Sequence, residues 1–277
     1  MVSTIRTGYT LPWYVKSNIA FFCAKVFPLR HLLHLLLALA ALTARAQDTE
    51  WRVPFITTPD EVVARMLKLA GTSAGDLVAD LGSGDGRIVI AAARQFGARG
   101  LGIELDAALV AASRENARKA GVADRVSIVQ GDVLRADFSQ ATVVTVYLLP
   151  DLMSQLQPRF VAELKPGTRI VSHSFRMTGW RPDRAENIRI AGPHPGQGDE
   201  STLYLWIVPA EVRGTWLGGG RRVRIEQSFQ EIDVGGATRA SLSGSEISWE
   251  SPQGRFHGRV QGERIVGDDG SVLERSR

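Results

Sequence analysis

The chain has 277 residues, of which 44% are hydrophobic and 22% are charged, a composition that is ordinary for a globular protein. Its formal net charge is +4, but residues 1–46 contain five basic and no acidic side chains. The remainder is therefore close to neutral, which argues against the broad basic surface of a nucleic-acid-binding protein.

Residues 1–46 are predicted to be an export signal. A basic stretch that ends at Arg30 precedes an apolar run, His31 to Leu42, and Ala44-Arg45-Ala46 has the small-x-small pattern of a cleavage site. The apolar run is shorter than the ~20 residues that span a bilayer. We expect cleavage and a periplasmic protein; an uncleaved leader would leave the chain cytoplasmic or tethered to the membrane.

Residues 47–210 alternate between helical and strand patterns. Helices are predicted at 59–70, 86–96, 107–120 and 151–164, the last interrupted by Pro158, and strands at 77–81, 100–104, 126–130, 142–148, 169–174 and 201–208. Short apolar strands separated by helices indicate a parallel sheet that is covered on both faces. The prediction is an α/β domain with a doubly wound, Rossmann-like sheet.

Residues 211–277 have a different pattern, with many glycines, alternating residues and no helical period. Three to five antiparallel strands are predicted. The segment is charge-balanced, with ten arginines and ten acidic residues. We expect a β-rich extension that buries one apolar face against the larger domain, with Trp216, Phe229, Ile232, Trp249 and Phe256 on that face. The alternative is a module that recognises a substrate or partner.

A glycine-rich turn, Asp80-Leu81-Gly82-Ser83-Gly84-Asp85-Gly86, lies where the first predicted strand passes into a helix. Ligands of open α/β sheets bind at this carboxyl edge. Arg87 stands where a Gly-x-Gly-x-x-Gly fingerprint has its third glycine, Asp80 and Asp85 would repel a pyrophosphate, and the turn lacks the Gly-Lys-Ser/Thr of a triphosphate site. S-adenosylmethionine fits these constraints because it has no phosphate and carries an ammonium and a sulfonium.

Two further acids end the next predicted strands. Glu104 follows Asp80 by 24 residues, near the spacing at which an acid bonds ribose hydroxyls in this topology. Asp132 ends the third strand and is placed to accept from the adenine amino group, while Asp80 would hold the amino end of the methionine moiety. Each acid alone also fits a solvated turn or a helix cap, but together they indicate one edge of a nucleoside pocket.

With these motifs the chain resembles the class I, seven-strand S-adenosylmethionine-dependent methyltransferases. Their first motif corresponds to Asp80–Gly86 and their late helix–turn–strand to Glu163–Ser172. The chain is more closely similar to the ATP-synthase c-subunit lysine methyltransferases and their bacterial relatives. This likeness is carried by Val53-Pro54-Phe55, Thr57-Thr58-Pro59, Asp80–Ala93, Gly102–Leu105, Gln155-Leu156, Glu163-Leu164, Phe175 and Trp180.

The resemblance implies N-methylation of a protein lysine, and it implies that Phe55, Thr57 and Thr58 cover the bound cofactor. The predicted site for S-adenosyl-L-methionine comprises these three residues together with Asp80, Gly82, Ser83, Gly84, Asp85, Gly86, Glu104, Leu105, Asp132 and Val133. The expected partner is a protein lysine or a small molecule, with no nucleic acid and with membrane contact only through the leader. The alternatives to a lysine methyltransferase are a small-molecule methyltransferase and a non-catalytic, exported binding protein with the same fold.

The acceptor side is less well defined by the sequence. The segment after the fourth strand usually faces the methyl group, and here it lacks the Asn/Asp-Pro-Pro-Tyr/Phe motif that aligns amide or adenine nitrogens. Tyr147 is a candidate for orienting an amine, Asp151 for accepting from an ammonium, and His173 for acting as a base. The alternatives are a core aromatic for Tyr147, a helix N-cap for Asp151 and a structural histidine for His173.

Metal and thiol chemistry are not expected. No group of carboxylates and histidines has convincing metal-ligand spacing. The only cysteine, Cys23, lies in the predicted leader, so cleavage would leave a chain without disulfides, a nucleophilic thiol or cysteine-metal sites.

Processing of the leader is directly testable. Because the predicted cleavage site follows Ala46, N-terminal sequencing of the protein purified from the periplasm should begin at Gln47. A full-length product recovered from the cytoplasm would contradict the export prediction.

Overall fold

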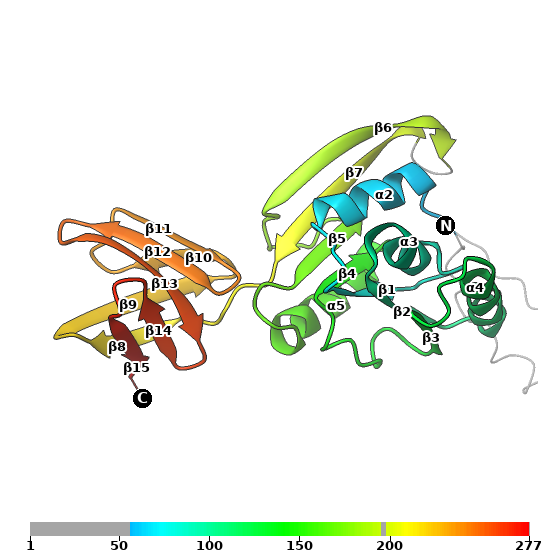
Figure 1. Ribbon diagram of the computed structural model, residues 1–277. Helices are drawn as coiled ribbons and strands as arrows, with labels where there is room; N and C mark the ends of the chain where they lie inside the picture. Colours follow the sequence, from blue (N-terminus) through cyan, green and yellow to red (C-terminus); the bar gives the residue numbers. More distant parts are fainter. Residues whose placement is uncertain (1–55, 195–197, 277) are drawn as a thin grey trace, which may run out of the picture. The chain divides into compact units, whose positions relative to one another are not determined.

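The computed structural model describes residues 56–194 and 198–276 (Figure 1). The predicted leader and the predicted cofactor-covering residue Phe55 lie outside these residues. In the described part of the chain, no helix is both long enough and apolar enough to cross a membrane.

Residues 77–207 build a seven-stranded sheet. Its strands are β1 (Leu77–Leu81), β2 (Arg99–Glu104), β3 (Val126–Gln130), β4 (Val143–Val146), β5 (Arg169–His173), β6 (Arg184–His194) and β7 (Gly198–Ile207), in the spatial order β3-β2-β1-β4-β5-β7-β6. The first five run parallel, and β7 is antiparallel to both β5 and β6. The predicted parallel-dominated sheet is confirmed. Strand β6 was not predicted, because its first half is polar and a register shift interrupts its second half.

Helices cover both faces of this sheet. Helices α2 (Asp60–Leu69), α3 (Arg87–Phe96) and α4 (Ala107–Lys119) pack on one face, and α5 (Pro150–Glu163) packs on the other (Figure 1). The predicted interruption of α5 is wrong, since the helix runs through Pro158. Met153, Leu156 and Phe160 are buried on both sides of that proline, so packing holds the helix together where a backbone hydrogen bond is lost.

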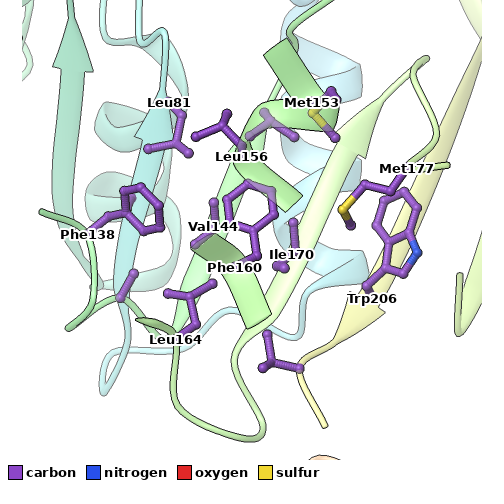
Figure 2. Packing of buried hydrophobic residues seen from close by; sticks show 14 of the residues in the cluster. Leu81, Phe138, Val144, Met153, Leu156, Phe160, Leu164, Ile170, Met177 and Trp206 are labelled. Atoms are coloured by element: carbon purple, nitrogen blue, oxygen red, sulfur yellow. The ribbon is translucent and has the colours of Figure 1, made fainter. Parts of the chain in front are cut away.

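Successive side chains of the central strands are buried alternately in these two apolar layers. Successive side chains of a strand point to opposite faces, so Val78 joins the layer of α2 and α3 while Ala79 joins the layer of α5. Figure 2 shows the α5 layer, in which Phe160 lies among residues of β4, β5 and β7. We call this layer the α5-face core, defined by the buried residues Ala79, Leu81, Ile103, Phe138, Ala141, Val144, Val146, Leu148, Met153, Leu156, Phe160, Leu164, Ile170, Met177, Trp180, Trp206 and Val208.

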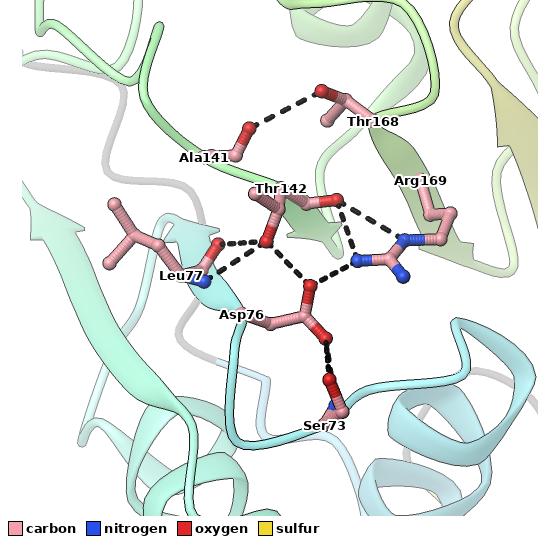
Figure 3. A network of polar contacts seen from close by, with 7 residues as sticks. All are labelled: Ser73, Asp76, Leu77, Ala141, Thr142, Thr168 and Arg169. Carbon is pink, nitrogen blue, oxygen red and sulfur yellow. Dashed lines mark hydrogen bonds and ion pairs between the residues drawn. The ribbon is translucent and has the colours of Figure 1, made fainter. Parts of the chain in front are cut away.

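A polar network ties together the amino ends of β1, β4 and β5 (Figure 3). The Asp76 carboxylate accepts hydrogen bonds from the Thr142 hydroxyl at 2.7 Å, from the Ser73 amide at 2.7 Å and from the Arg169 guanidinium. Burial acts to raise the pKa of Asp76, but these hydrogen bonds outweigh it and the pKa is lowered. Because the three strands are fixed here in one register, their carboxyl ends are brought level at the opposite edge.

Residues 214–275 form a second, eight-stranded antiparallel sheet. Its strands are β8 (Gly214–Gly218), β9 (Arg221–Ser228), β10 (Glu231–Val234), β11 (Arg239–Ser243), β12 (Glu246–Ser251), β13 (Gly254–Gln261), β14 (Arg264–Gly267) and β15 (Val272–Arg275), in the order β10-β9-β8-β15-β14-β13-β12-β11. The β-rich prediction is confirmed, but three to five strands was too few. Turns of two residues join many of these short strands, and runs that looked continuous in the sequence are hairpins.

The second sheet has its own core, which corrects the expectation that its apolar residues cover the larger domain. Trp216, Trp249 and Phe256 are buried inside it, with the rings of Trp249 and Phe256 stacked at 3.9 Å between centroids. Ile232 packs against the same core. Of the five residues expected to cover the larger domain, Phe229 alone packs on the α5-face core.

Candidate functional site

The glycine turn after β1 depends on backbone conformations that favour glycine. Gly82, Gly84 and Gly86 have φ values of 78°, 53° and 80°, in the left-handed region. A Cβ on Gly86 would lie 2.1 Å from the Ser113 hydroxyl of α4, so no larger residue fits there without movement. The Gly82 and Ser83 amides both donate to the Ile103 carbonyl, at 2.9 and 3.0 Å, which fixes the turn against β2.

Asp80 is buried within β1, with 3% of its surface exposed. Its Oδ1 accepts a 2.7 Å hydrogen bond from the Thr145 hydroxyl, because the two residues are register partners on β1 and β4. Burial raises the pKa of Asp80 to about 7; the Thr145 hydrogen bond opposes this, and the carboxylates of Asp85 and Glu104 add to it. A cation beside Asp80 would therefore be strongly favoured.

Glu104 is the last residue of β2, and its side chain holds the glycine turn that follows the neighbouring strand β1. Its Oε2 accepts from the Gly84 amide at 2.8 Å and its Oε1 from the Asp106 amide at 2.9 Å. Each oxygen keeps acceptor capacity for a ligand hydroxyl. The adjoining Leu105 is 59% exposed, which offers an apolar surface beside the carboxylate.

Asp132 and Val133 follow the end of β3. Asp132 Oδ1 accepts from the Leu134 amide at 2.9 Å, and its Oδ2 lies 3.8 Å from Arg135 Nε. Val133 packs against the α5-face core. Since β3, β2 and β1 are neighbours, Asp132, Glu104 and Asp80 follow one another along one edge of the sheet, as the sequence predicts.

Asp85 has a different environment from the other acids. It forms an ion pair with Arg87 at 2.6 Å, and Arg87 Nη1 donates to the Thr58 carbonyl at 2.9 Å. Arg87 thus links the glycine turn to the segment before α2, a role that was not predicted from the sequence. The only signal for it was an acid two residues before an arginine at a helix start. The Ser83 side chain is buried, and its hydroxyl has no hydrogen-bond partner in residues 56–194 and 198–276.

A cluster of aromatic side chains lies at the carboxyl ends of β4 and β5. The rings of Tyr147 and His173 lie 4.2 Å apart between centroids, and those of Tyr147 and Phe175 lie 6.0 Å apart. His173 is fully buried, with Nδ1 3.3 Å from the Thr58 hydroxyl and Nε2 3.0 Å from the Ser201 hydroxyl. This enclosure favours a positioning role for His173 over that of an accessible base. Thr57, next to Thr58, is half-buried.

Asp151 does not cap α5, contrary to the alternative considered for it. The N-cap residue is Leu149, Pro150 is the first helical residue, and Asp151 lies exposed in the first turn. There its charge faces the positive end of the helix dipole.

The residues present fit S-adenosylmethionine. A buried carboxylate with a raised pKa, reinforced by two more acids, matches a cationic ligand and opposes an anionic one. The glycines leave the backbone of the turn open to close approach by a ligand, and Glu104 and Asp132 supply acceptors for hydroxyl and amino donors. Among the described residues, no group of three or more His, Cys, Asp or Glu side chains is arranged to hold a metal ion.

Comparison with known proteins agrees with this assignment. Residues 80–184 match the model of the ANTKMT methyltransferase domain. A protein-lysine N-methyltransferase of Saccharolobus islandicus is 42% identical over 157 residues, which are 56% of this chain and 94% of that protein. A lysine N-methyltransferase of Mus musculus, named for the ATP-synthase c-subunit, is 36% identical over 131 residues, and the chain spans about half of its length (52%).

A solved structure is also similar. The RNA methyltransferase from Salinibacter ruber, in complex with S-adenosyl-L-homocysteine, is 50% identical in sequence, with a TM-score of 0.52; the match covers 57% of this chain and 96% of that one. The sheet has this topology and carries acids at three strand ends, and the similar structure binds the demethylated cofactor. Together these features define the protein as an S-adenosylmethionine-dependent methyltransferase. Because the match to the Saccharolobus islandicus protein extends over nearly the whole of that relative, the chain belongs to the ANTKMT methyltransferase family, which confirms the resemblance drawn from the sequence.

The buried position of Asp80 predicts a pH-dependent affinity for S-adenosylmethionine. A cation binds the ionised carboxylate better, so the contribution of Asp80 to affinity should rise as pH passes upward through about 7 and should be about tenfold smaller at pH 6 than at pH 8. Isothermal titration calorimetry across this range measures it.

The control is Asp80→Asn, which should bind weakly and with a flatter pH profile. Titration of the ligand's own ammonium is common to both proteins, so the difference between the two profiles isolates Asp80. Equal affinities and parallel profiles for the wild type and the variant would contradict the assignment.

Proposed function

We propose that the protein transfers a methyl group from S-adenosylmethionine to the side-chain nitrogen of a protein lysine. The observation that carries the proposal is the 42% identity to a protein-lysine N-methyltransferase over nearly all of that relative's length. The mouse relative, also named for lysine methylation, supports the same acceptor at 36% identity.

The β1–β3 side of the site would hold the cofactor. When bound, S-adenosylmethionine supplies a methyl group on a cationic sulfur. Asp80 would receive the amino end of the methionine moiety, Glu104 the ribose hydroxyls and Asp132 the adenine amino group. Arg87 would act indirectly, since it fixes both the turn and Thr58.

The β4–β5 side would receive the acceptor. A lysine attacks through its neutral amine, and the loss of solvation on entering the site would disfavour its ammonium form. Tyr147 and Phe175 are half-buried and together supply an aromatic wall for the amine, and the buried His173 packs against the Tyr147 ring. The remaining requirement is alignment of nitrogen with methyl group, to which positioning contributes most of the rate.

RNA is the second candidate acceptor, because the Salinibacter ruber neighbour carries the name of an RNA methyltransferase at 50% identity. The near-neutral charge of residues 47–277 makes it the weaker candidate, since affinity for nucleic acid depends on neutralising phosphates.

Transfer of tritium from methyl-labelled S-adenosylmethionine to a whole-cell lysate tests the acceptor. We expect label in protein that is resistant to ribonuclease and that yields methyl-lysine on acid hydrolysis. Tyr147→Ala should lower the rate by roughly 10- to 100-fold through loss of alignment while cofactor affinity is kept, and Tyr147→Phe separates the ring from the hydroxyl.

Three results would overturn the lysine proposal. These are label that ribonuclease removes, label confined to small molecules, and label in amino acids other than lysine. Each of these results would leave the assignment as a methyltransferase intact and would assign a different acceptor.

A further inference from the structure

The turn between β9 and β10 has an unusual residue at its first position. Ser228 and Glu231 are paired across the hairpin, so Phe229 and Gln230 form a two-residue turn. Phe229 has a φ of 54°, in the left-handed region that glycine normally fills in such turns. A bulky side chain in this conformation is strained, which indicates that the ring is held by its surroundings.

Those surroundings are the indole of Trp180, in the segment between β5 and β6. The Phe229 ring stacks on Trp180 at 4.8 Å between centroids and 7° between planes. Gln230 Oε1 accepts from Trp180 Nε1 at 2.8 Å, and its Nε2 donates to the Arg181 carbonyl at 2.6 Å. Gln230 is buried, and Trp180 is 1% exposed. The turn therefore covers the indole and also satisfies its buried donor.

Trp180 anchors the segment that begins at the acceptor side of the site. Its carbonyl accepts from Trp206 Nε1 at 3.0 Å, and Figure 2 shows Met177 of the same segment beside Trp206. Five residues before Trp180, Phe175 approaches Tyr147, and its carbonyl accepts from the Ser172 hydroxyl at 2.6 Å. A short stretch of chain, held by the buried side chains of Met177 and Trp180, thus joins the Phe229–Gln230 turn to the aromatic wall.

We propose that the Phe229–Gln230 turn is a positioning element for residues 174–181 and, through Phe175, for the acceptor. This rests on the proposed function in placing the acceptor beside Tyr147 and Phe175. Asp80 and Glu104 lie on β1 and β2, and Asp132 follows β3; strand β4 separates these three strands from β5, which the segment follows. The turn therefore acts on acceptor use and leaves cofactor affinity unchanged. The Saccharolobus islandicus relative has too few residues outside the match for a second sheet of this size, so the positioning turn is an addition in the present chain.

Hydrogen–deuterium exchange of the full chain tests whether the turn positions residues 174–181, and it needs no acceptor. Phe229→Gly keeps a favourable turn but removes the ring, and Gln230→Ala removes both side-chain hydrogen bonds. Each should speed exchange of amides 174–181 several-fold and leave the glycine turn, residues 80–86, unchanged. Phe256→Leu is the matched control, since it removes a stacked ring from the second sheet's own core. Unchanged exchange in 174–181, or an equal rise in the control, would overturn the proposal.

Methyl transfer from tritiated S-adenosylmethionine to lysate proteins tests the acceptor step in the same variants. We expect transfer to fall at least fivefold, cofactor affinity by calorimetry to stay within twofold, and Phe229→Tyr to restore transfer. Wild-type transfer rates in both variants would refute the effect on the acceptor. If the wild-type protein itself labels no lysine, the proposed function fails, while the exchange measurement still decides whether the turn positions the segment.

Discussion

A carboxylate buried in the middle of the parallel sheet sets the chemistry of the site. Asp80 lies on the central strand β1, where it accepts a hydrogen bond from Thr145, and no ion pair reaches it from residues 56–194 or 198–276. Such a group is costly to ionise without a partner, and its pKa of about 7 expresses that cost. A ligand that brings positive charge supplies the missing partner, which explains why the turn beside it carries acids that would repel a phosphate.

The site divides into two halves around Asp80. On one side, Glu104 ends β2 and Asp132 follows β3, and both supply acceptors suited to a nucleoside. On the other, Tyr147 follows β4 with an aromatic surface suited to an amine, and the buried His173 at the end of β5 packs against the Tyr147 ring. Arg87 and His173 both contact Thr58, so the segment before α2 is fastened to both halves. In the proposed function, this order of strands places the methyl donor and the acceptor on opposite sides of one carboxylate.

Much of this arrangement was predictable from the sequence because it depends on local patterns. The apolar runs located β1 to β5, and the acids that end them fell at one edge because parallel strands share their carboxyl ends. Contacts that depend on the register between strands could not be predicted from the sequence. Thr145 contacts Asp80 because these two residues are paired when β4 lies beside β1. Strand β6 lacked a sustained apolar alternation, and the second sheet's eight strands are separated by turns too short to mark in advance. The contact of Phe229 with Trp180 joins residues 49 positions apart and leaves no local signal.

The most direct test of the central claim is a crystal structure of the protein with S-adenosylhomocysteine bound. We expect ribose hydroxyls on the Glu104 carboxylate, the amino end of the ligand beside Asp80, and the adenine between Leu105 and Val133 with its amino group toward Asp132. A nucleoside bound in any place where it contacts neither Asp80 nor Glu104 would contradict the central role of these two acids.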